Sequence, residues 1–181
     1  MRYLVLLFTL IFSACGLRMQ ETDEDRFDSR LRFFESYIVQ RSGLMKIAPP
    51  LVRVSQSRSK EYRAEIWINE LPKYLYPAAP RHVLSIFVGL LREAPEAVLE
   101  HAATHELCHI KLRHVAQLWG INIAQEDEAE QCAYDAIGED TFGAAKYYYL
   151  QRDLKNSDIA AFSLEELKII LRTIYKKERK E

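Results

Sequence analysis

Three residues whose types and spacing suit hydrolytic chemistry lie near the middle of the chain: His105, Glu106 and His109. On a helix, two histidines four residues apart lie on one face, about one turn from each other. Two imidazoles placed in this way can each reach a tetrahedral Zn²⁺ at about 2.0–2.1 Å. A glutamate beside that face can take a proton from zinc-bound water. The spacing therefore predicts one zinc ion per chain, with the histidines as ligands and Glu106 as the catalytic base.

Chance alone can produce a five-residue motif, and a charged helix face that carries histidines is often a solvated surface without a metal. A hydrolytic zinc site needs three protein ligands and a fourth position for water. The prediction therefore depends on a third ligand elsewhere in the chain.

An acidic segment after the motif offers this third ligand. If the segment is helical, one of its faces carries two carboxylates and two small residues: Glu126, Ala129, Glu130 and Ala133. The alanines would let this helix approach the first one closely and bring the carboxylate of Glu126 to the zinc, at about 2.0–2.2 Å. Glu130, one turn on, would accept a hydrogen bond from the outer nitrogen of a zinc-bound histidine. The helix dipole alone would favour acidic residues here, but it would not explain the interleaved alanines.

The helix that must hold the histidine pair is predicted over residues 94–119. Pro95 suits a first helical position, Gly120 suits a C-terminal cap, and apolar residues recur between them at helical spacing. On such a helix His114 would lie about 140° away from the zinc face.

The rest of the chain alternates between periodic segments and turn residues, which predicts an α+β fold. A small three-stranded sheet would pack on the long zinc-binding helix, and the C-terminal half would be mostly helical. The predicted elements are a helix at 25–40 ended by Ser42 and Gly43, strands at 51–57, 64–69 and 83–88, a loop at 71–81, a turn at 89–91, and helices at 126–135, 142–155 and from Ser163 onward. The apolar stripe of the first helix consists of Phe27, Leu31, Phe34 and Ile38. The last helix opens with a capping box at 163–166, and its stripe consists of Leu167, Ile170, Leu171 and Ile174.

The composition is that of one ordinary globular domain. The chain has 181 residues, of which 49% are hydrophobic and 28% are charged, and this length suffices for a buried core. The formal net charge is −1, so bulk electrostatics do not favour a nucleic acid as partner. Nothing in the composition specifies an oligomeric state.

The N-terminus is predicted to be a targeting segment rather than part of the fold. Arg2 precedes an apolar run that is too short for a membrane-spanning helix of about 20 residues. The run ends at Cys15 in a sequence that resembles a bacterial lipobox, with Phe12 in place of the usual Leu; the alternative is a plain signal peptide or an uncleaved anchor. Lipidation of Cys15 would hold the protein at the bacterial cell envelope, facing the periplasm or the exterior. The expected organisation is a lipoprotein signal peptide at 1–14, a tether at 15–24 and a single domain at 25–181.

Two further cysteines, Cys108 and Cys132, would then lie in an oxidising compartment. A disulfide between them requires the helices that carry them to pack together. The sequence does not specify their separation, so it leaves a disulfide and two buried free thiols equally open.

Taken together, these motifs resemble the HtpX/BepA-like zinc peptidases, which are gluzincins. Residues 86–91 and 105–114 are similar to that family's strand ending in Gly-Leu-Leu and to its His-Glu-x-x-His helix followed by Arg-His. Glu126 opens a segment similar to the family's Glu-x-x-Ala-Asp, whose first Glu is the third zinc ligand. The resemblance covers about residues 86–150 and implies a minimal gluzincin-like metallopeptidase domain with a zincin-like fold.

This sequence departs from the family pattern at three places. Cys108 replaces the usual Gly between the histidines, and Glu130 replaces Asp. Only sixteen residues separate His109 from Glu126, which is short for the family. Family members also use a His or Tyr on the substrate side of the zinc, and the candidates here are His82, Tyr147, Tyr148 and Tyr149.

The resemblance implies a zinc endopeptidase that hydrolyses unfolded or misassembled polypeptides of the cell envelope. Residues 83–88, if they form an exposed edge strand, could hold an extended substrate by β-augmentation.

Two other interpretations remain open. The motif also resembles the SprT-like zinc proteins, which take a third histidine downstream, but His114 would be turned away and His101 lies too far along the helix to close the site easily. Alternatively, the chain is a zinc-stabilised or metal-free lipoprotein that binds partners as a chaperone-like module without hydrolysing them.

Overall fold

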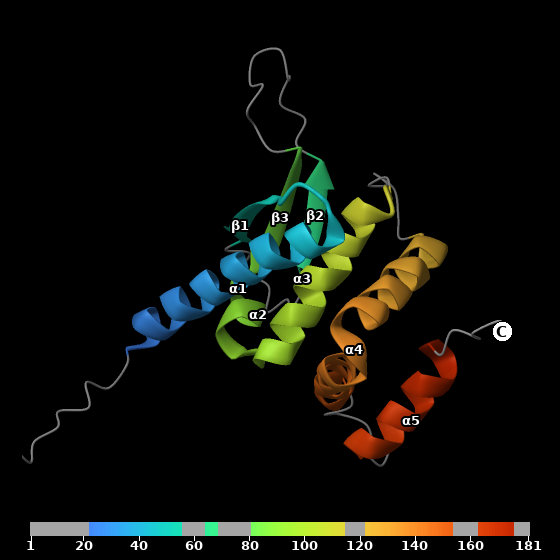
Figure 1. Cartoon of the computed structure of the whole chain (residues 1–181). Helices are drawn as coiled ribbons and strands as arrows, with labels where there is room; N and C mark the ends of the chain where they lie inside the picture. The colour runs from blue at the N-terminus through green and yellow to red at the C-terminus, as the bar shows by residue number, and fades with distance from the viewer. Residues whose placement is uncertain (1–21, 56–63, 69–80, 115–121, 154–162, 176–181) are drawn as a thin grey trace, which may run out of the picture.

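The computed structural model describes residues 22–55, 64–68, 81–114, 122–153 and 163–175 and has an α+β architecture, which confirms the predicted class. Its elements are α1 (Asp23–Met45), β1 (Leu51–Ser55), β2 (Ala64–Ile68), β3 (His82–Phe87), α2 (Val88–Glu93), α3 (Glu96–Lys111), α4 (Ile123–Asp153) and α5 (Leu164–Tyr175). The sheet lies at one end of the molecule, and α3 lies between α1 and α4 (Figure 1).

The strands form one mixed sheet in the order β1-β3-β2. β3 is central, because it pairs with β1 in parallel and with β2 in antiparallel orientation. Leu84 and Ile86 of β3 are fully buried, as expected for alternate apolar residues on one face of a strand. Residues 83–88 therefore do not meet the condition, an exposed edge strand, under which they could hold a substrate. Within the described residues, β1 and β2 form the two edges, and β2 is the edge strand that contacts α3.

Helix α1 packs on α2 and α3 through the apolar stripe that the sequence predicts. Phe34 and Ile38 are fully buried in the main core. The helix does not end at Ser42 and Gly43 as predicted but runs on to Met45, where Lys46 takes a left-handed conformation with φ 58°. Ser42 is fully buried, so packing of this last turn outweighs the cost of about 1 kcal/mol for a glycine inside a helix.

Helix α3, which carries the histidine pair, is shorter than predicted. It begins at Glu96, after Pro95 in the N-cap position, and it ends at Lys111 rather than at residue 119. The chain leaves the helix because Arg113 adopts a left-handed conformation with φ 59°. Residues 89–91, predicted as a turn, belong to the short helix α2.

Helix α4 is one element with a kink at Gly138, whose φ of 80° and ψ of 167° are not helical. Such a backbone conformation favours glycine, which has no Cβ to clash. The helices predicted at 126–135 and 142–155 are therefore the two arms of α4. The first arm packs on α3 through Ala129 and Ala133, which are both fully buried.

Helix α5 begins with the capping box that the sequence predicts. The Ser163 hydroxyl accepts a hydrogen bond from the backbone N–H of Glu166, and the Glu166 carboxylate accepts one from the backbone N–H of Ser163. Leu167 and Leu171 are buried against α4. The rest of the predicted stripe is wrong in the described structure, because Ile170 and Ile174 are 39% and 63% exposed.

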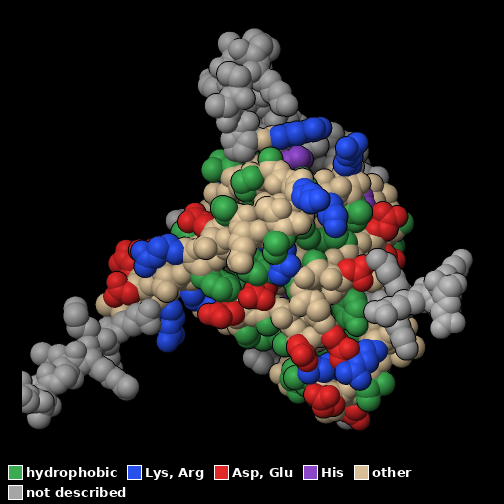
Figure 2. Space-filling view, viewed as in Figure 1, with side chains coloured by type: hydrophobic (Ala, Val, Ile, Leu, Met, Phe, Trp, Pro, Cys, Tyr) green, Lys and Arg blue, Asp and Glu red, His purple; other side chains and the backbone are tan. Residues whose placement is uncertain are grey.

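Several predictions concern residues outside the described part of the chain. These are the signal peptide, the lipidation of Cys15, the loop at 71–81 up to residue 80, and the cap at Gly120. In the described residues, no helix has both the length and the apolar character needed to cross a membrane. Basic and acidic side chains both occur on the visible face, with hydrophobic ones between them (Figure 2).

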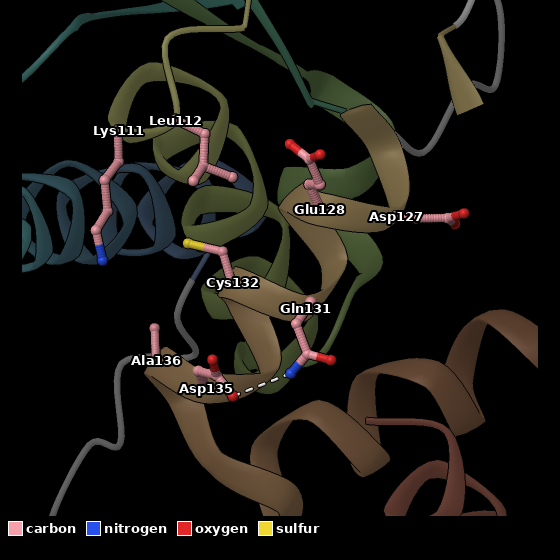
Figure 3. Close-up of a pocket in the computed structure, with 8 residues that line it drawn as sticks. All are labelled: Lys111, Leu112, Asp127, Glu128, Gln131, Cys132, Asp135 and Ala136. Carbon is pink, nitrogen blue, oxygen red and sulfur yellow. Dashed lines mark hydrogen bonds between the residues drawn. The ribbon is translucent and has the colours of Figure 1, made fainter. Parts of the chain in front are cut away.

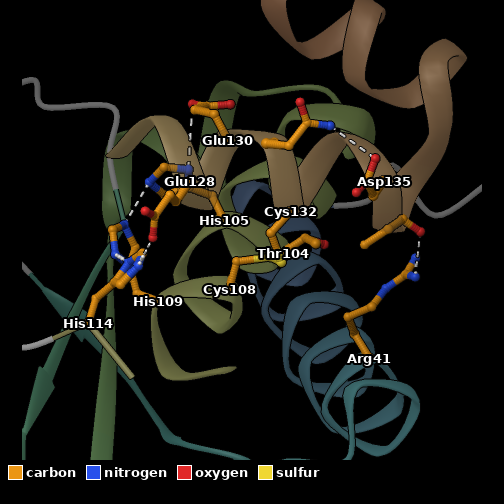
Figure 4. Close-up of a disulfide and its surroundings, with 12 residues drawn as sticks. Arg41, Thr104, His105, Cys108, His109, His114, Glu128, Glu130, Cys132 and Asp135 are labelled. Atoms are coloured by element: carbon orange, nitrogen blue, oxygen red, sulfur yellow. Dashed lines mark hydrogen bonds and ion pairs between the residues drawn. A yellow bond between two sulfur atoms is a disulfide. The ribbon is translucent and has the colours of Figure 1, made fainter. Parts of the chain in front are cut away.

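A disulfide joins Cys108 of α3 to Cys132 of α4, with 5.9 Å between the Cα atoms (Figure 4). It therefore links the helix of the histidine pair to the helix of Glu126. Of the two states that the sequence leaves open for these cysteines, the structure has the bonded one.

We expect loss of this disulfide to destabilise the protein by about 3 kcal/mol, because the bond restricts an unfolded loop with a sequence separation of 24. Urea unfolding of the wild type and of a Cys108→Ala/Cys132→Ala variant measures the difference. Adding a reductant to the wild type should lower its midpoint and leave the double variant unchanged. Equal midpoints for the oxidised wild type and the double variant would contradict the expectation.

Candidate metal centre

His105 and His109 of α3 and Glu126 of α4 bring three ligand atoms to one point. The Nε2 atoms of the two histidines are 3.0 Å apart. The Glu126 carboxylate lies 3.1 Å from His105 Nε2 and 3.6 Å from His109 Nε2. Within the described residues, these three form the cluster of His, Cys, Asp and Glu side chains that could hold a metal ion.

The spacing of these atoms fits a tetrahedral ion. Ligand atoms with bonds of about 2.0–2.2 Å to a tetrahedral centre lie roughly 3.3–3.6 Å from one another. The histidine nitrogens are 3.0 Å apart, Glu126 Oε2 lies 3.1 Å from His105 Nε2, and Glu126 Oε1 lies 3.6 Å from His109 Nε2, so each contact is close to this range. Two imidazoles and a carboxylate are a common ligand set for zinc in hydrolases. The cluster could therefore hold a metal ion of the kind that the sequence predicts.

The backbone explains why these side chains meet. His105 and His109 are one turn apart on α3. The buried Ala129 and Ala133 allow α4 to lie close to α3, so that Glu126 reaches the histidines from the first turn of α4. Asn122 supports this turn, since its side-chain oxygen accepts a hydrogen bond from the backbone N–H of Gln125.

The pKa values of the three clustered residues are shifted in different directions from their usual values. Burial disfavours the charged form of His105, but its hydrogen bond to Glu126 and the nearby carboxylates outweigh burial and raise its pKa. Burial and the neighbouring His105 lower the pKa of His109 to about 4. The hydrogen bond with His105 lowers the pKa of Glu126. The Glu126 carboxylate thus favours the charged form of His105, and His105 in turn disfavours a charge on His109.

We expect zinc affinity to fall about tenfold per pH unit between about pH 6 and 4.5. The raised pKa of His105 means that the metal-free protein holds one proton that zinc must displace in this window. His109, with a pKa of about 4, is already neutral there. Competition titrations with a chelator at several pH values measure the slope. A slope of two protons in this window would contradict the assignment.

Glu130 lies behind the cluster, between two histidines. Its carboxylate is 3.1 Å from His101 Nε2 and 3.5 Å from His105 Nδ1, and it accepts a hydrogen bond of 2.7 Å from Lys146 Nζ. Although burial opposes ionisation, these partners lower the pKa of Glu130 far below its usual value. His105 Nδ1 is buried and has no hydrogen-bond partner among the described residues. Glu130 therefore lies near the outer nitrogen of His105 without a described hydrogen bond to it, and its shorter contact is to His101.

His101 belongs to the support of the site and not to its ligand set. Its side chain is 5% exposed, and its ring packs edge-on against Phe142 and Tyr149. Burial lowers its pKa, although the hydrogen bond to Glu130 opposes this shift. His101 thus fixes the orientation of Glu130.

Glu106 follows His105 on α3 and is buried, with 9% exposure. Its negative charge is one of the causes that raise the pKa of His105. A carboxylate at this position is close enough to the histidine pair to affect its protonation.

The structure corrects the prediction for His114. Because α3 ends at Lys111, His114 is not turned away but folds back against the helix. Its Nδ1 lies 2.9 Å from Nδ1 of His109, and its Nε2 lies 3.1 Å from the carboxylate of Glu128. His114 thus contacts the ring nitrogen of His109 that faces away from the cluster, so this geometry does not make it a third ligand. Sequence periodicity missed this contact, since no glycine or proline next to His114 marks the helix end.

None of the four candidates for a substrate-side residue is joined to the cluster by a described hydrogen bond. His82 begins β3, and burial lowers its pKa. Tyr149 packs on His101, and burial raises the pKa of its hydroxyl. Tyr147 and Tyr148 are partly buried against the two cores.

A pocket of about 560 Å³ lies beside the site, at the C-terminal end of α3 and along the first arm of α4 (Figure 3). None of the three clustered residues lines it, whereas Glu128 and Cys132 do. Its other lining residues are Lys111, Leu112, Asp127, Gln131, Asp135 and Ala136. The pocket thus adjoins the disulfide and the partner of His114 rather than the candidate metal position.

Comparison of the chain with protein-family models, with curated proteins and with solved structures finds no match.

Proposed function

We propose that the protein is a zinc-dependent endopeptidase with a zincin-like fold, and that His105, His109 and Glu126 hold one zinc ion per chain. The observation that carries the proposal is the convergence of three side chains from two separate helices, each offering one ligand atom within 4.8 Å of the other two. The side chain of Glu126 is 44% exposed, so the centre opens to solvent on the side where water and substrate would enter.

The chemistry divides between the ion and the protein. Zinc bound at this centre supplies a Lewis acid that acidifies water and polarises a scissile carbonyl. Glu106 is the general base that accepts the proton of the attacking water and then delivers it to the leaving amine. Glu130 orients His105 through its outer nitrogen, and His101 and Lys146 hold Glu130 in place.

The proposed substrate is an extended segment of an unfolded or misassembled polypeptide. β2 is the edge strand that contacts α3, and an edge strand can add a substrate strand through backbone hydrogen bonds. This role replaces the one that the sequence suggests for residues 83–88, which form the central strand.

The proposed location is the bacterial cell envelope. The sequence that resembles a lipobox would tether the protein through a lipid on Cys15. The Cys108–Cys132 disulfide supports an oxidising compartment.

Cleavage of a chemically unfolded, alkylated protein tests this function. The zinc-loaded protein should cleave it, a chelator should stop the cleavage, and added zinc should restore it. A protein that binds both zinc and the unfolded chain but leaves the chain intact would instead be a binding module, and the peptidase proposal would fail.

A further inference from the structure

We propose that His114 and Glu128 position His109 for metal binding, through a chain of hydrogen bonds that runs from Glu128 to His114 to His109. This inference rests on the proposed zinc centre and assigns two further residues to it. His114 and Glu128 would act as positioning residues, since neither contributes an atom to the three that converge on the metal position.

The two ring nitrogens of His109 face different partners. Nε2 points to the cluster, 3.0 Å from His105 Nε2. Nδ1 points to the opposite side, 2.9 Å from His114 Nδ1, and His114 Nε2 in turn lies 3.1 Å from Glu128 Oε2. Figure 4 shows the rings of His109 and His114 and the carboxylate of Glu128 in succession, linked by these contacts.

The order of these groups specifies the proton on each ring. A carboxylate can only accept, so a neutral His114 donates its Nε2–H to Glu128 and keeps its Nδ1 as an acceptor. His109 must then donate its Nδ1–H to His114, which leaves the lone pair on Nε2 for the metal. This arrangement holds His109 in the tautomer that a metal ligand requires.

The backbone after α3 places His114 for this role. The backbone N–H of His114 donates to the carbonyl of His109, at 2.9 Å, and Arg113 takes the left-handed conformation that closes this turn. The side chain of His114 is then 7% exposed, whereas that of Glu128 is 66% exposed. The link between the two rings is therefore shielded from water, and the outer link to Glu128 is weakened by solvent.

The burial of each link sets the size of the expected effects. Loss of a hydrogen bond that supports a ligand typically reduces metal affinity 10–100-fold. We therefore expect zinc to bind about 10–100-fold more weakly to His114→Leu, which fills space but offers no acceptor. His114→Asn should retain most of the affinity, since its side-chain oxygen lies near the position of Nδ1. Glu128→Gln should weaken binding by less, about 3–10-fold.

Zinc titration against a chelator tests the inference in the full chain, with Asp127→Asn as a control for loss of a neighbouring charge. X-ray absorption of the zinc-loaded wild type should show two imidazoles on the metal. Glu128 lies on the surface, so Glu128→Gln tests the chain even if His114→Leu does not fold. Affinities of His114→Leu and Glu128→Gln within twofold of the wild type would overturn the inference and leave the zinc centre standing. A third imidazole on zinc would also overturn it, and a wild type that binds no zinc would overturn both proposals.

Discussion

The Glu106→Gln variant is expected to bind zinc as tightly as the wild type within a few-fold and to cleave an unfolded polypeptide about 10²–10⁴-fold more slowly. General base catalysis contributes a factor of this size. Glutamine has nearly the shape of glutamate but cannot accept the proton of the attacking water. Initial cleavage rates at saturating zinc, together with a chelator competition for each protein, measure the two effects separately.

Glu96→Gln is the matched control for this variant, because it removes the same charge from the exposed first turn of the same helix. It should retain both the rate and the affinity of the wild type. Unchanged cleavage by Glu106→Gln would remove Glu106 from the proposed mechanism. Parallel loss of zinc and of cleavage would instead give Glu106 a role in holding the site together.

The Glu126→Ala variant is expected to bind zinc more than roughly 100-fold more weakly than the wild type, because it removes one of three ligands. Loss of a hydrogen bond that only supports a ligand has a smaller effect, up to about 100-fold. The metal-free protein should remain folded, since this carboxylate is 44% exposed and lies in the first turn of α4. Chelator competition measures the affinity, and far-ultraviolet circular dichroism measures the fold.

Asp127→Ala is the control on α4, since the side chain of Asp127 is exposed and does not belong to the cluster. It should bind zinc as the wild type does. If Glu126→Ala keeps wild-type affinity, the third ligand lies elsewhere and the geometry of the three-residue cluster is not that of the metal centre.

The sequence was sufficient to predict that His105, His109 and Glu126 meet. Two residues one helical turn apart share a face whatever the tertiary structure, so the histidine pair needed only a helix. The alanines at 129 and 133 indicated a close helix contact, and both are fully buried. Helical periodicity was therefore sufficient to predict the part of the site that depends on which residues share a helix face.

The contact between His109 and His114 could not be predicted in this way. It requires α3 to end at Lys111, and the end is produced by a left-handed Arg113 rather than by glycine. Non-glycine residues rarely adopt this conformation, so the sequence favoured a helix that continues to residue 119. The angle of about 140° between His114 and the zinc face followed from that assumption.

The central position of β3 in the sheet could not be predicted from the sequence either. Strand order depends on the connections that place β2 on one side of β3 and β1 on the other. Alternating apolar residues indicate which face of a strand is buried, but they do not indicate which strands pair with it. The edge that could hold a substrate is therefore assigned to β2 only once the pairing is known.

The most direct test of the zinc centre is the anomalous scattering of crystals grown with one equivalent of zinc, measured on both sides of the zinc absorption edge. One peak is expected, within about 2.0–2.2 Å of Nε2 of His105, Nε2 of His109 and a carboxylate oxygen of Glu126. A peak at another position, or Glu126 turned to solvent with no peak between the two histidines, would contradict the account.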